Sequence, residues 1–152
     1  DHVNAYEYWG PGGASGLNRS TAEQDMVNFI KTIANYARTI KCNPYFGIFP
    51  QNAEALSSHN DYVQAVTGIG AENVWYNDNI SQSSSYTNGV LENLDVFESA
   101  GKLVLVVDYL TDPEKVARLA ELAREHSFVP YAGRLELDEL GPPVPGSILG
   151  KP

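Results

Sequence analysis

The sequence predicts an α/β protein in which short parallel strands alternate with helices. Short apolar runs recur along the chain, and each is followed by polar or acidic residues and then by a stretch with helical periodicity. This alternation is typical of βαβ units, whose right-handed crossovers place the helices outside a parallel sheet. The phosphate-binding motifs G-x-G-x-x-G and G-x-x-x-x-G-K-S/T are absent from the sequence, so nothing favours a nucleotide-binding fold. An open doubly wound sheet and a closed barrel both satisfy the pattern.

Residues 45–49 (YFGIF) form the central strand of this prediction. The run is rich in aromatic and β-branched residues and lies between Pro44 and Pro50, which is typical of a short buried strand. Gln51, Asn52 and Glu54 follow at once. Because α/β proteins bind ligands at the carboxyl ends of their strands, we expect these three side chains in a functional site.

Residues 20–41 give the clearest helix. Ser20 and Glu23 match a capping box, and Lys41 complements the helix dipole at the other end. Apolar residues at helical spacing predict the buried face, namely Met26, Phe29, Ile30, Ile33, Ala37 and Ile40.

The remaining elements repeat the plan of strand, polar exit and helix. In chain order they are short helices at 53–57 and 61–66, a strand within 67–77, a polar loop at 77–85, a helix at 86–100, a strand at 103–107, a helix beginning at Pro113, a strand at 128–132 and a short helix or turn at 134–140. Thr111 or Asp112 is expected to cap the helix at Pro113, with Val116, Leu119, Ala120 and Ala123 on its inner face.

The two ends of the chain differ from the repeats. Residues 1–19 carry aromatic residues and then glycines, which predicts a loop. Residues 141–152 (GPPVPGSILGKP) are rich in proline and glycine and predict a tail or linker. We therefore expect one α/β domain at residues 1–140.

The composition and net charge of the sequence argue against several classes of binding partner. The net charge is −9, which argues against nucleic acid and anionic membranes because both attract basic surfaces. No stretch approaches the ~18 apolar residues of a membrane-spanning helix. Cys42 is the single cysteine, so an intrachain disulfide is excluded. The sequence begins at Asp1 without an initiator methionine or a signal-peptide pattern, as expected of a mature product or part of something longer.

Carboxylates at strand exits suggest hydrolysis of glycosidic bonds. We expect the carboxylates of Asp1, Glu54 and Asp108 at strand exits, and that of Glu72 near another. Two carboxyl groups across a pocket can cleave a glycoside, one as the acid and the other as nucleophile or base. Aromatic rings at the same rim would stack on sugars, namely Tyr8, Trp9, Tyr76, Tyr109 and Tyr131. Gln51 and Asn52 would bind hydroxyl groups. The alternatives are solvated or capping carboxylates, and aromatic rings that cover the end of a core.

Other chemistries have less support in the sequence. The three histidines, His2, His59 and His126, are scattered, and no HxxE, HExxH or CxxC spacing occurs. A G-x-S-x-G nucleophile elbow is also absent. We therefore expect neither a metal nor another cofactor.

Several stretches together resemble the glycoside hydrolase family of endo-α-1,4-polygalactosaminidases. They are VNAYEYW, NPYFGIFPQNAEAL, VTGIGAENVWYN, AGKLVLVVDY and FVPYAGRLELDEL, which reach to about Leu140. The family fold is a (β/α)8 barrel, so the resemblance implies that this chain is the second half of a TIM barrel. It also implies an amino-sugar polysaccharide as substrate and an extracellular or periplasmic location.

The resemblance assigns roles to individual residues. It implies that Glu54 and Asp1 are the catalytic pair, without saying which of the two is the acid. Positions that match the family's pocket are Gln51, Asn52, Tyr76, Asp108, Tyr109 and Tyr131. Because a half-barrel exposes sheet edges, we expect pairing with a second copy that closes the barrel. A non-catalytic sugar-binding or assembly half, or a different hydrolysis by the same carboxylates, are the alternatives.

Overall fold

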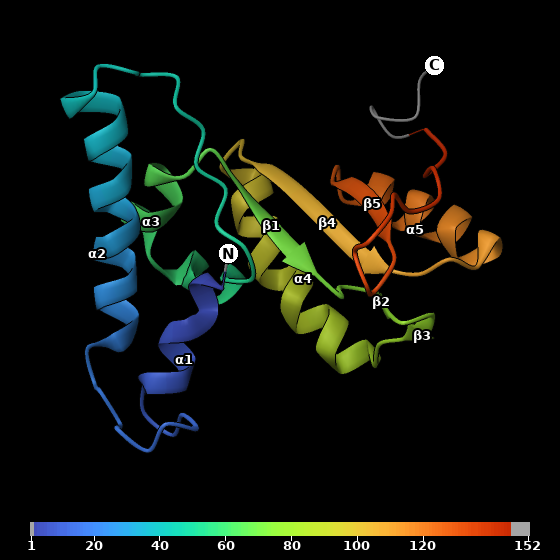
Figure 1. The fold of residues 1–152 in the computed structure, drawn as a ribbon, viewed down its shortest axis with the longest axis horizontal. Helices are drawn as coiled ribbons and strands as arrows, with labels where there is room; N and C mark the ends of the chain where they lie inside the picture. The colour runs from blue at the N-terminus through green and yellow to red at the C-terminus, as the bar shows by residue number, and fades with distance from the viewer. Residues whose placement is uncertain (1, 147–152) are drawn as a thin grey trace.

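A computed structural model describes residues 2–146 of the chain (Figure 1). Its centre is a parallel sheet of strands β1 (Gly68–Glu72), β4 (Leu103–Tyr109) and β5 (Val129–Gly133), in the order β1-β4-β5. The helical elements are η1 (Val3–Ala5), α1 (Tyr6–Trp9), α2 (Ala22–Asn35), the π-helix η2 (Tyr36–Ile40), η3 (Glu54–Ser58), α3 (Asn60–Ala65), α4 (Ser84–Ser99) and α5 (Pro113–Glu125). The predicted parallel α/β fold is confirmed.

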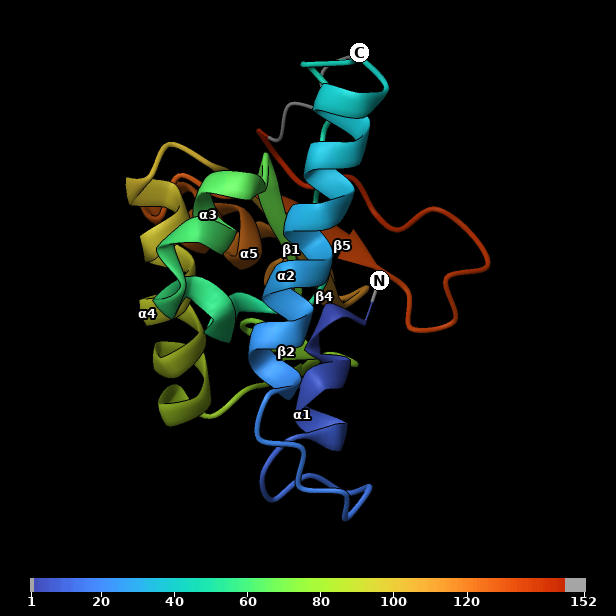
Figure 2. The same ribbon diagram turned by 90° about the vertical axis from the view of Figure 1, so that its left-hand side faces the viewer.

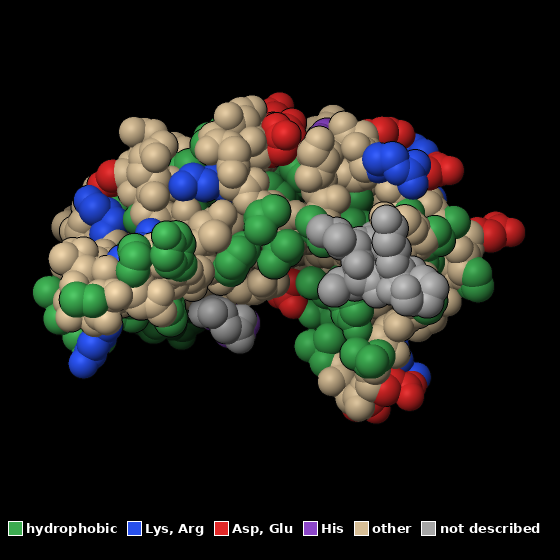
Figure 3. Space-filling view, turned by 90° about the horizontal axis from the view of Figure 1, so that it is seen from above, with side chains coloured by type: hydrophobic (Ala, Val, Ile, Leu, Met, Phe, Trp, Pro, Cys, Tyr) green, Lys and Arg blue, Asp and Glu red, His purple; other side chains and the backbone are tan. Residues whose placement is uncertain are grey.

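The helices cover one face of the sheet. In Figure 2, α3, α4 and α5 all lie to the same side of the strands. Along β4 the side chains alternate accordingly, since Val104 is only 2% exposed whereas its neighbour Leu103 is 51% exposed. We call the covered side the outer face and the opposite side the inner face. The space-filling view shows the molecule hollowed on the side away from these helices (Figure 3).

The predicted buried strand at residues 45–49 is wrong. The segment is extended but not a regular strand; Tyr45 is 94% exposed, and Ile48 is the only buried residue of the five. Next to it, the Gly70 N–H donates to the Pro50 carbonyl (2.8 Å) and the Asn52 N–H to the Gly70 carbonyl (2.9 Å), as in a parallel ladder. Pro50 has no N–H to donate, so the ladder is interrupted there, although the Ile48 carbonyl still accepts from the N–H groups of Thr67 (2.9 Å) and Gly68 (3.4 Å).

Two glycines of β1 let side chains of this extended segment lie over its inner face. A Cβ atom on Gly68 would be 2.4 Å from Cε1 of Phe49, and one on Gly70 would be 2.1 Å from Oε1 of Gln51. Both contacts are too short for a side chain. The segment therefore uses the absence of side chains on β1 to place Phe49 and Gln51 on the inner face.

The buried face of α2 differs from the prediction. Its buried residues are Ala22, Val27, Ile30 and Ala34, whereas the predicted core residues Phe29, Ile33 and Ile40 lie at the surface. The small alanines allow α2 to pack closely on α1 and α3. The predicted capping box is also absent: the N-cap is Thr21, whose hydroxyl donates to Asp25 rather than capping the helix backbone.

The other helices agree better with the sequence. Asp112 caps α5 by accepting from the Glu114 N–H (3.0 Å), and Ser83 caps α4 in the same way from Tyr86 (3.2 Å). The predicted inner face of α5 is buried: Val116, Leu119, Ala120 and Ala123. This face packs against β5, the last strand in the order β1-β4-β5.

Three segments predicted to be irregular, or left open, have defined structures. Residues 3–9 are helical (η1 and α1) rather than a loop, and the polar loop after β1 contains a hairpin of β2 (Tyr76–Asn77) and β3 (Ile80–Ser81). Residues 134–140 form a turn rather than a helix, with the Leu137 N–H donating to the Arg134 carbonyl (3.1 Å).

The start of the predicted tail packs against the domain. The Gly141 N–H donates to the Tyr131 hydroxyl (2.9 Å), and Val144 is buried. The rest of the predicted tail lies outside the described residues, so the boundary at residue 140 stays a prediction. No helix among residues 2–146 is long and apolar enough to cross a membrane.

Candidate functional site

Four of the predicted site residues meet at the carboxyl end of β1. Glu72 is the last residue of β1, and its N–H donates to Oδ1 of Asn52 (2.9 Å). The Asn52 amide in turn donates to one Glu72 carboxylate oxygen, and the Tyr109 hydroxyl, from the end of β4, donates to the other. Gln51 also donates to this carboxylate. We call Gln51, Asn52, Glu72 and Tyr109 the Glu72 network.

The Glu72 network keeps its carboxylate ionised. Partial burial raises the pKa of Glu72. The hydrogen bonds from Tyr109, Asn52 and Gln51, together with the nearby charge of His2, lower this pKa by a larger total amount, so the net shift is downward. The pKa of Tyr109 is raised to about 12 by burial and by its bond to Glu72. At neutral pH the network therefore presents a carboxylate held by fixed donors.

Glu54 has the opposite electrostatic environment. It begins η3, directly after the extended segment, and burial raises its pKa, with the charge of Glu7 adding to the effect. Its carboxyl group is close enough to Tyr6, Tyr62 and Tyr86 to raise the pKa of each, after the larger effect of burial. Glu54 therefore sits among aromatic rings, where its protonated form is favoured.

Asp108 faces the helices rather than the Glu72 network. It is fully buried, and its carboxylate accepts from the backbone N–H groups of Val74 (2.7 Å), Trp75 (3.0 Å) and Tyr76 (3.0 Å). Burial raises its pKa to about 6 even though these bonds lower it. Asp108 thus anchors the loop that follows Glu72, and direct contact with a sugar stays a prediction.

The remaining predicted aromatic residues are dispersed. Tyr8 and Trp9 are exposed and form an edge-to-face pair with ring centroids 5.4 Å apart. Trp9 also lines an apolar hollow of about 420 Å³ with Leu17, Met26 and Phe29. Tyr76 lines a separate hollow between α4 and α5, of about 330 Å³, and the Tyr131 hydroxyl is engaged by Gly141. None of these four residues belongs to the Glu72 network, and sugar binding by them remains untested.

The second predicted catalytic residue, Asp1, lies outside the described residues. Its neighbour Val3 donates to the Gln51 carbonyl (3.2 Å), so the start of the described chain runs beside the Glu72 network. Within residues 2–146, no group of three or more histidine, cysteine or acidic side chains is arranged to hold a metal ion.

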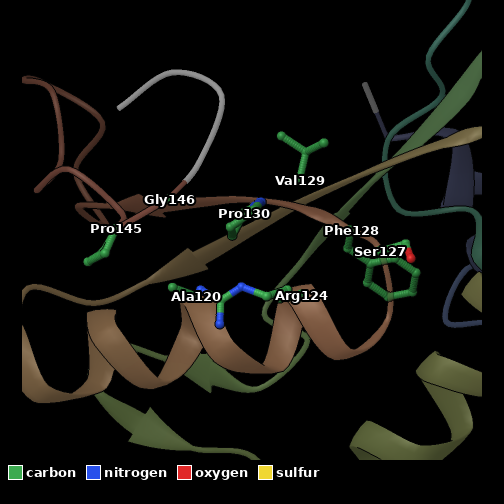
Figure 4. A pocket seen from close by; sticks show the side chains of 8 residues that line it. All are labelled: Ala120, Arg124, Ser127, Phe128, Val129, Pro130, Pro145 and Gly146. Atoms are coloured by element: carbon green, nitrogen blue, oxygen red, sulfur yellow. The ribbon is translucent and has the colours of Figure 1, made fainter. Parts of the chain in front are cut away.

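A hollow at the amino end of β5, the end away from the Glu72 network, is lined by side chains of a different kind. About 330 Å³ in volume, it lies between α5, the amino end of β5 and the segment after residue 141 (Figure 4). Its lining residues are Ala120, Arg124, Ser127, Phe128, Val129, Pro130, Pro145 and Gly146, with no carboxylate among them. It is therefore unsuited to the acid chemistry predicted for this chain.

Two residues near the site were not predicted from the sequence. His2 influences Glu72 electrostatically, and Asp78 lies in the turn between β2 and β3. Neither has a spacing that marks it, because both approach the sheet edge only through tertiary structure.

The sequence of the chain is similar to those of proteins from other organisms. No protein-family model matches the chain. An uncharacterized protein of Thermotoga maritima is 34% identical over 151 residues, covering 92% of this chain and 46% of that protein. An uncharacterized protein of Methanocaldococcus jannaschii is 32% identical over 152 residues, covering 92% and 43% respectively. The chain thus spans less than half the length of these relatives.

A solved structure has a similar fold. It is the glycoside hydrolase domain of PelA from Pseudomonas aeruginosa, with a TM-score of 0.66, 16% sequence identity, and coverage of 93% of this chain and 54% of that chain. At this identity the similarity establishes the fold alone. The chain therefore has the architecture of part of a TIM-barrel-like glycoside hydrolase domain, as the sequence predicted.

Proposed function

We propose that this chain contributes to a glycoside hydrolase that cleaves a polysaccharide containing amino sugars, similar to an endo-α-1,4-galactosaminidase. The observation that carries the proposal is the contrast between Glu72 and Glu54, which are linked through one short segment, because Asn52, two residues before Glu54, is hydrogen-bonded to Glu72. The pKa of Glu72 is lowered and that of Glu54 is raised. Pairs of acids whose environments drive their pKa values apart are typical of acid–base catalysis and of glycosidases.

The two environments suggest separate roles. Glu54, whose pKa is raised by burial, would donate a proton to the leaving glycosidic oxygen. Glu72, ionised and held by Tyr109 and Asn52, would face the positive charge that develops on the sugar. The resemblance implies Asp1 as the partner of Glu54, and that assignment stays a prediction beside the one for Glu72. Asn52 and Gln51 would fix both Glu72 and the substrate hydroxyls.

Release of reducing ends from α-1,4-galactosamine oligomers tests the proposal. We expect Glu54→Gln and Glu72→Gln each to lower kcat by at least ~100-fold, because general acid–base groups contribute about 10²–10⁴-fold. Activity should fall at low pH as Glu72 is protonated, and at high pH as Glu54 loses its proton. Glu98→Gln, on the exposed end of α4, removes the same charge as a control. Full activity of both site variants would refute the proposal, and Asp1→Asn tests the other pairing.

Sugar binding without turnover is the second candidate function. It is favoured by the open inner face, because a half-barrel leaves part of a barrel pocket unlined. The wild-type chain would then bind oligosaccharide in a titration, and no reducing ends would form at any pH.

We also propose that a second copy of the chain covers the open inner face. The extended segment and β5 both form edges of the sheet, so two copies could pair edge to edge around a two-fold axis. Light scattering at two protein concentrations should give a mass near twice 16.6 kDa. A mass of one chain at both concentrations would contradict pairing. The extracellular or periplasmic location stays a prediction.

A further inference from the structure

A small polar hollow adjoins the Glu72 network at the carboxyl ends of β4 and β5. Its volume is about 240 Å³, less than the ~300–1,000 Å³ of sites for drug-sized ligands, so it suits a single small ring. Tyr109 lines it and also donates to Glu72, which places the hollow beside the proposed catalytic carboxylate. The other lining residues are Asp78, Asn79, Leu110, Thr111, Gly133, Arg134, Leu135 and Glu136.

One wall of the hollow is held rigidly. Oδ1 of Asn79 accepts from the backbone N–H groups of Thr111 (2.9 Å) and Asp112 (3.0 Å), and the Asn79 N–H donates to the Tyr109 carbonyl (3.0 Å). Lys115 donates to the Asn79 carbonyl (2.5 Å). These bonds tie the β2–β3 turn to the end of β4. The neighbouring residue Asp78 is therefore presented from a fixed backbone.

Of the charged residues around the hollow, Arg134 has ion-pair partners and Asp78 has none among residues 2–146. Arg134, the cation of the lining, lies 3.9 Å from Glu136 and 3.7 Å from Asp138, and it also donates to Glu139. Asp78 is exposed and has no hydrogen bond or ion pair with any residue among 2–146. Because the cation is already neutralised by its neighbours, Asp78 leaves the hollow with an unpaired negative charge.

We propose that this hollow binds one protonated amino-sugar unit, with the Asp78 carboxylate against the ammonium group. An unpaired carboxylate attracts a cation, while the Tyr109 ring offers an apolar surface and the Thr111 hydroxyl a partner for sugar hydroxyls. The inference rests on the proposed function and assigns Asp78 the selection of amino sugars over their N-acetylated forms. Acetylation removes the positive charge and with it the attraction.

Titrations followed by NMR with galactosamine and with N-acetylgalactosamine test this assignment in the whole chain. We expect the wild type to prefer galactosamine, and Asp78→Asn to weaken galactosamine binding about 1.4- to fivefold, the range of an exposed ion pair worth ~0.2–1 kcal/mol. Binding of N-acetylgalactosamine should not change. The preference should also disappear at ~1 M salt, where the Debye length is about 3 Å. Glu98→Gln, which removes an equal charge at the opposite end of the sheet, should leave both affinities unchanged.

The outcomes separate this inference from the proposed function. Equal binding of both sugars by the wild type, or an unchanged preference in Asp78→Asn, overturns the assignment of Asp78 even if hydrolysis is observed. If Asp78→Asn abolishes the preference for galactosamine, the assignment is supported even when no hydrolysis is detected, because binding of a monosaccharide requires no turnover.

Discussion

The two faces of the parallel sheet differ in what covers them. On the outer face, Val104, Val106 and Asp108 are buried beneath helices, whereas on the inner face Leu103, Leu105 and Val107 remain partly or largely accessible. The inner face also carries the Glu72 network at its carboxyl end. The outer face is therefore part of a packed hydrophobic core. The inner face combines the candidate site with accessible surface that another segment or subunit could cover.

This difference separates stability from function. Helices α4 and α5 stabilise the sheet by packing against strand side chains of the outer face, which point away from the candidate site. This packing therefore does not require the site residues to be apolar. The inner residues of β1 are Gly68, Gly70 and Glu72, which would make a poor core. The face that contributes least to packing is thus the face best equipped to bind a ligand.

Charge substitution at adjacent positions should give the largest contrast between the faces. Val104→Asp places an unpaired carboxylate in the outer core and should cost more than about 4 kcal/mol of unfolding free energy. Leu103→Asp, one residue earlier and facing inward, should cost less than about 1 kcal/mol. Urea denaturation followed by circular dichroism measures both. Similar losses would show that the inner face is as buried as the outer face in solution.

The buried carboxylate of the outer face should produce a pH effect of intermediate size. The pKa of Asp108 is raised from 3.8 to about 6, so the folded state holds a proton that the unfolded state releases between those values. Its contribution to stability is therefore present below about pH 4 and is lost as the pH rises to about 6. A shift of this size corresponds to about 3 kcal/mol.

Comparison with an amide variant isolates that contribution. Between pH 4 and pH 7, the unfolding free energy of the wild type should fall by about 3 kcal/mol relative to Asp108→Asn. A constant difference between wild type and Asp108→Asn across this range would mean that Asp108 is ionised throughout, held by its three N–H donors.

The outer face was easier to predict from the sequence than the inner face. The helical spacing of Val116, Leu119 and Ala123 identified the buried side of α5, because one contact surface decides that pattern. Residues 45–49 misled the prediction because their three aromatic residues are exposed and only Ile48 is buried. Their apolar character indicates a strand, but their burial requires a covering neighbour that residues 2–146 do not provide.

The candidate site was predictable in part. Gln51, Asn52, Glu72 and Tyr109 follow from the rule that strand exits share one edge. Asp108 and Tyr109 are adjacent on one strand, so their side chains had to face opposite sides, and only one could join the network. His2 and Asp78 could not be found by spacing, since a turn and a distant segment bring them to the edge.

A glycine pair gives the smallest and most local test of the inner face. Gly70→Ala puts a methyl group where the Gln51 side chain lies, so Gln51 must move and its bond to Glu72 is lost. We expect a loss of less than about 1 kcal/mol in stability, at or below the low end for overpacking, because the tip of the flexible Gln51 side chain can move away. The pKa of Glu72 should also rise toward its ordinary value, measured by carboxyl NMR.

Gly89→Ala is the matched control on α4. A Cβ atom there meets nothing within 4 Å, and alanine is the better helix former, so this variant should gain about 0.5–1 kcal/mol. Opposite signs for the two glycines would show that Gly70 is required by its contact and not by backbone freedom. If Gly70→Ala leaves both stability and the Glu72 pKa unchanged, Gln51 does not lie over β1 in solution, and the carboxylate is held by Asn52 and Tyr109 alone.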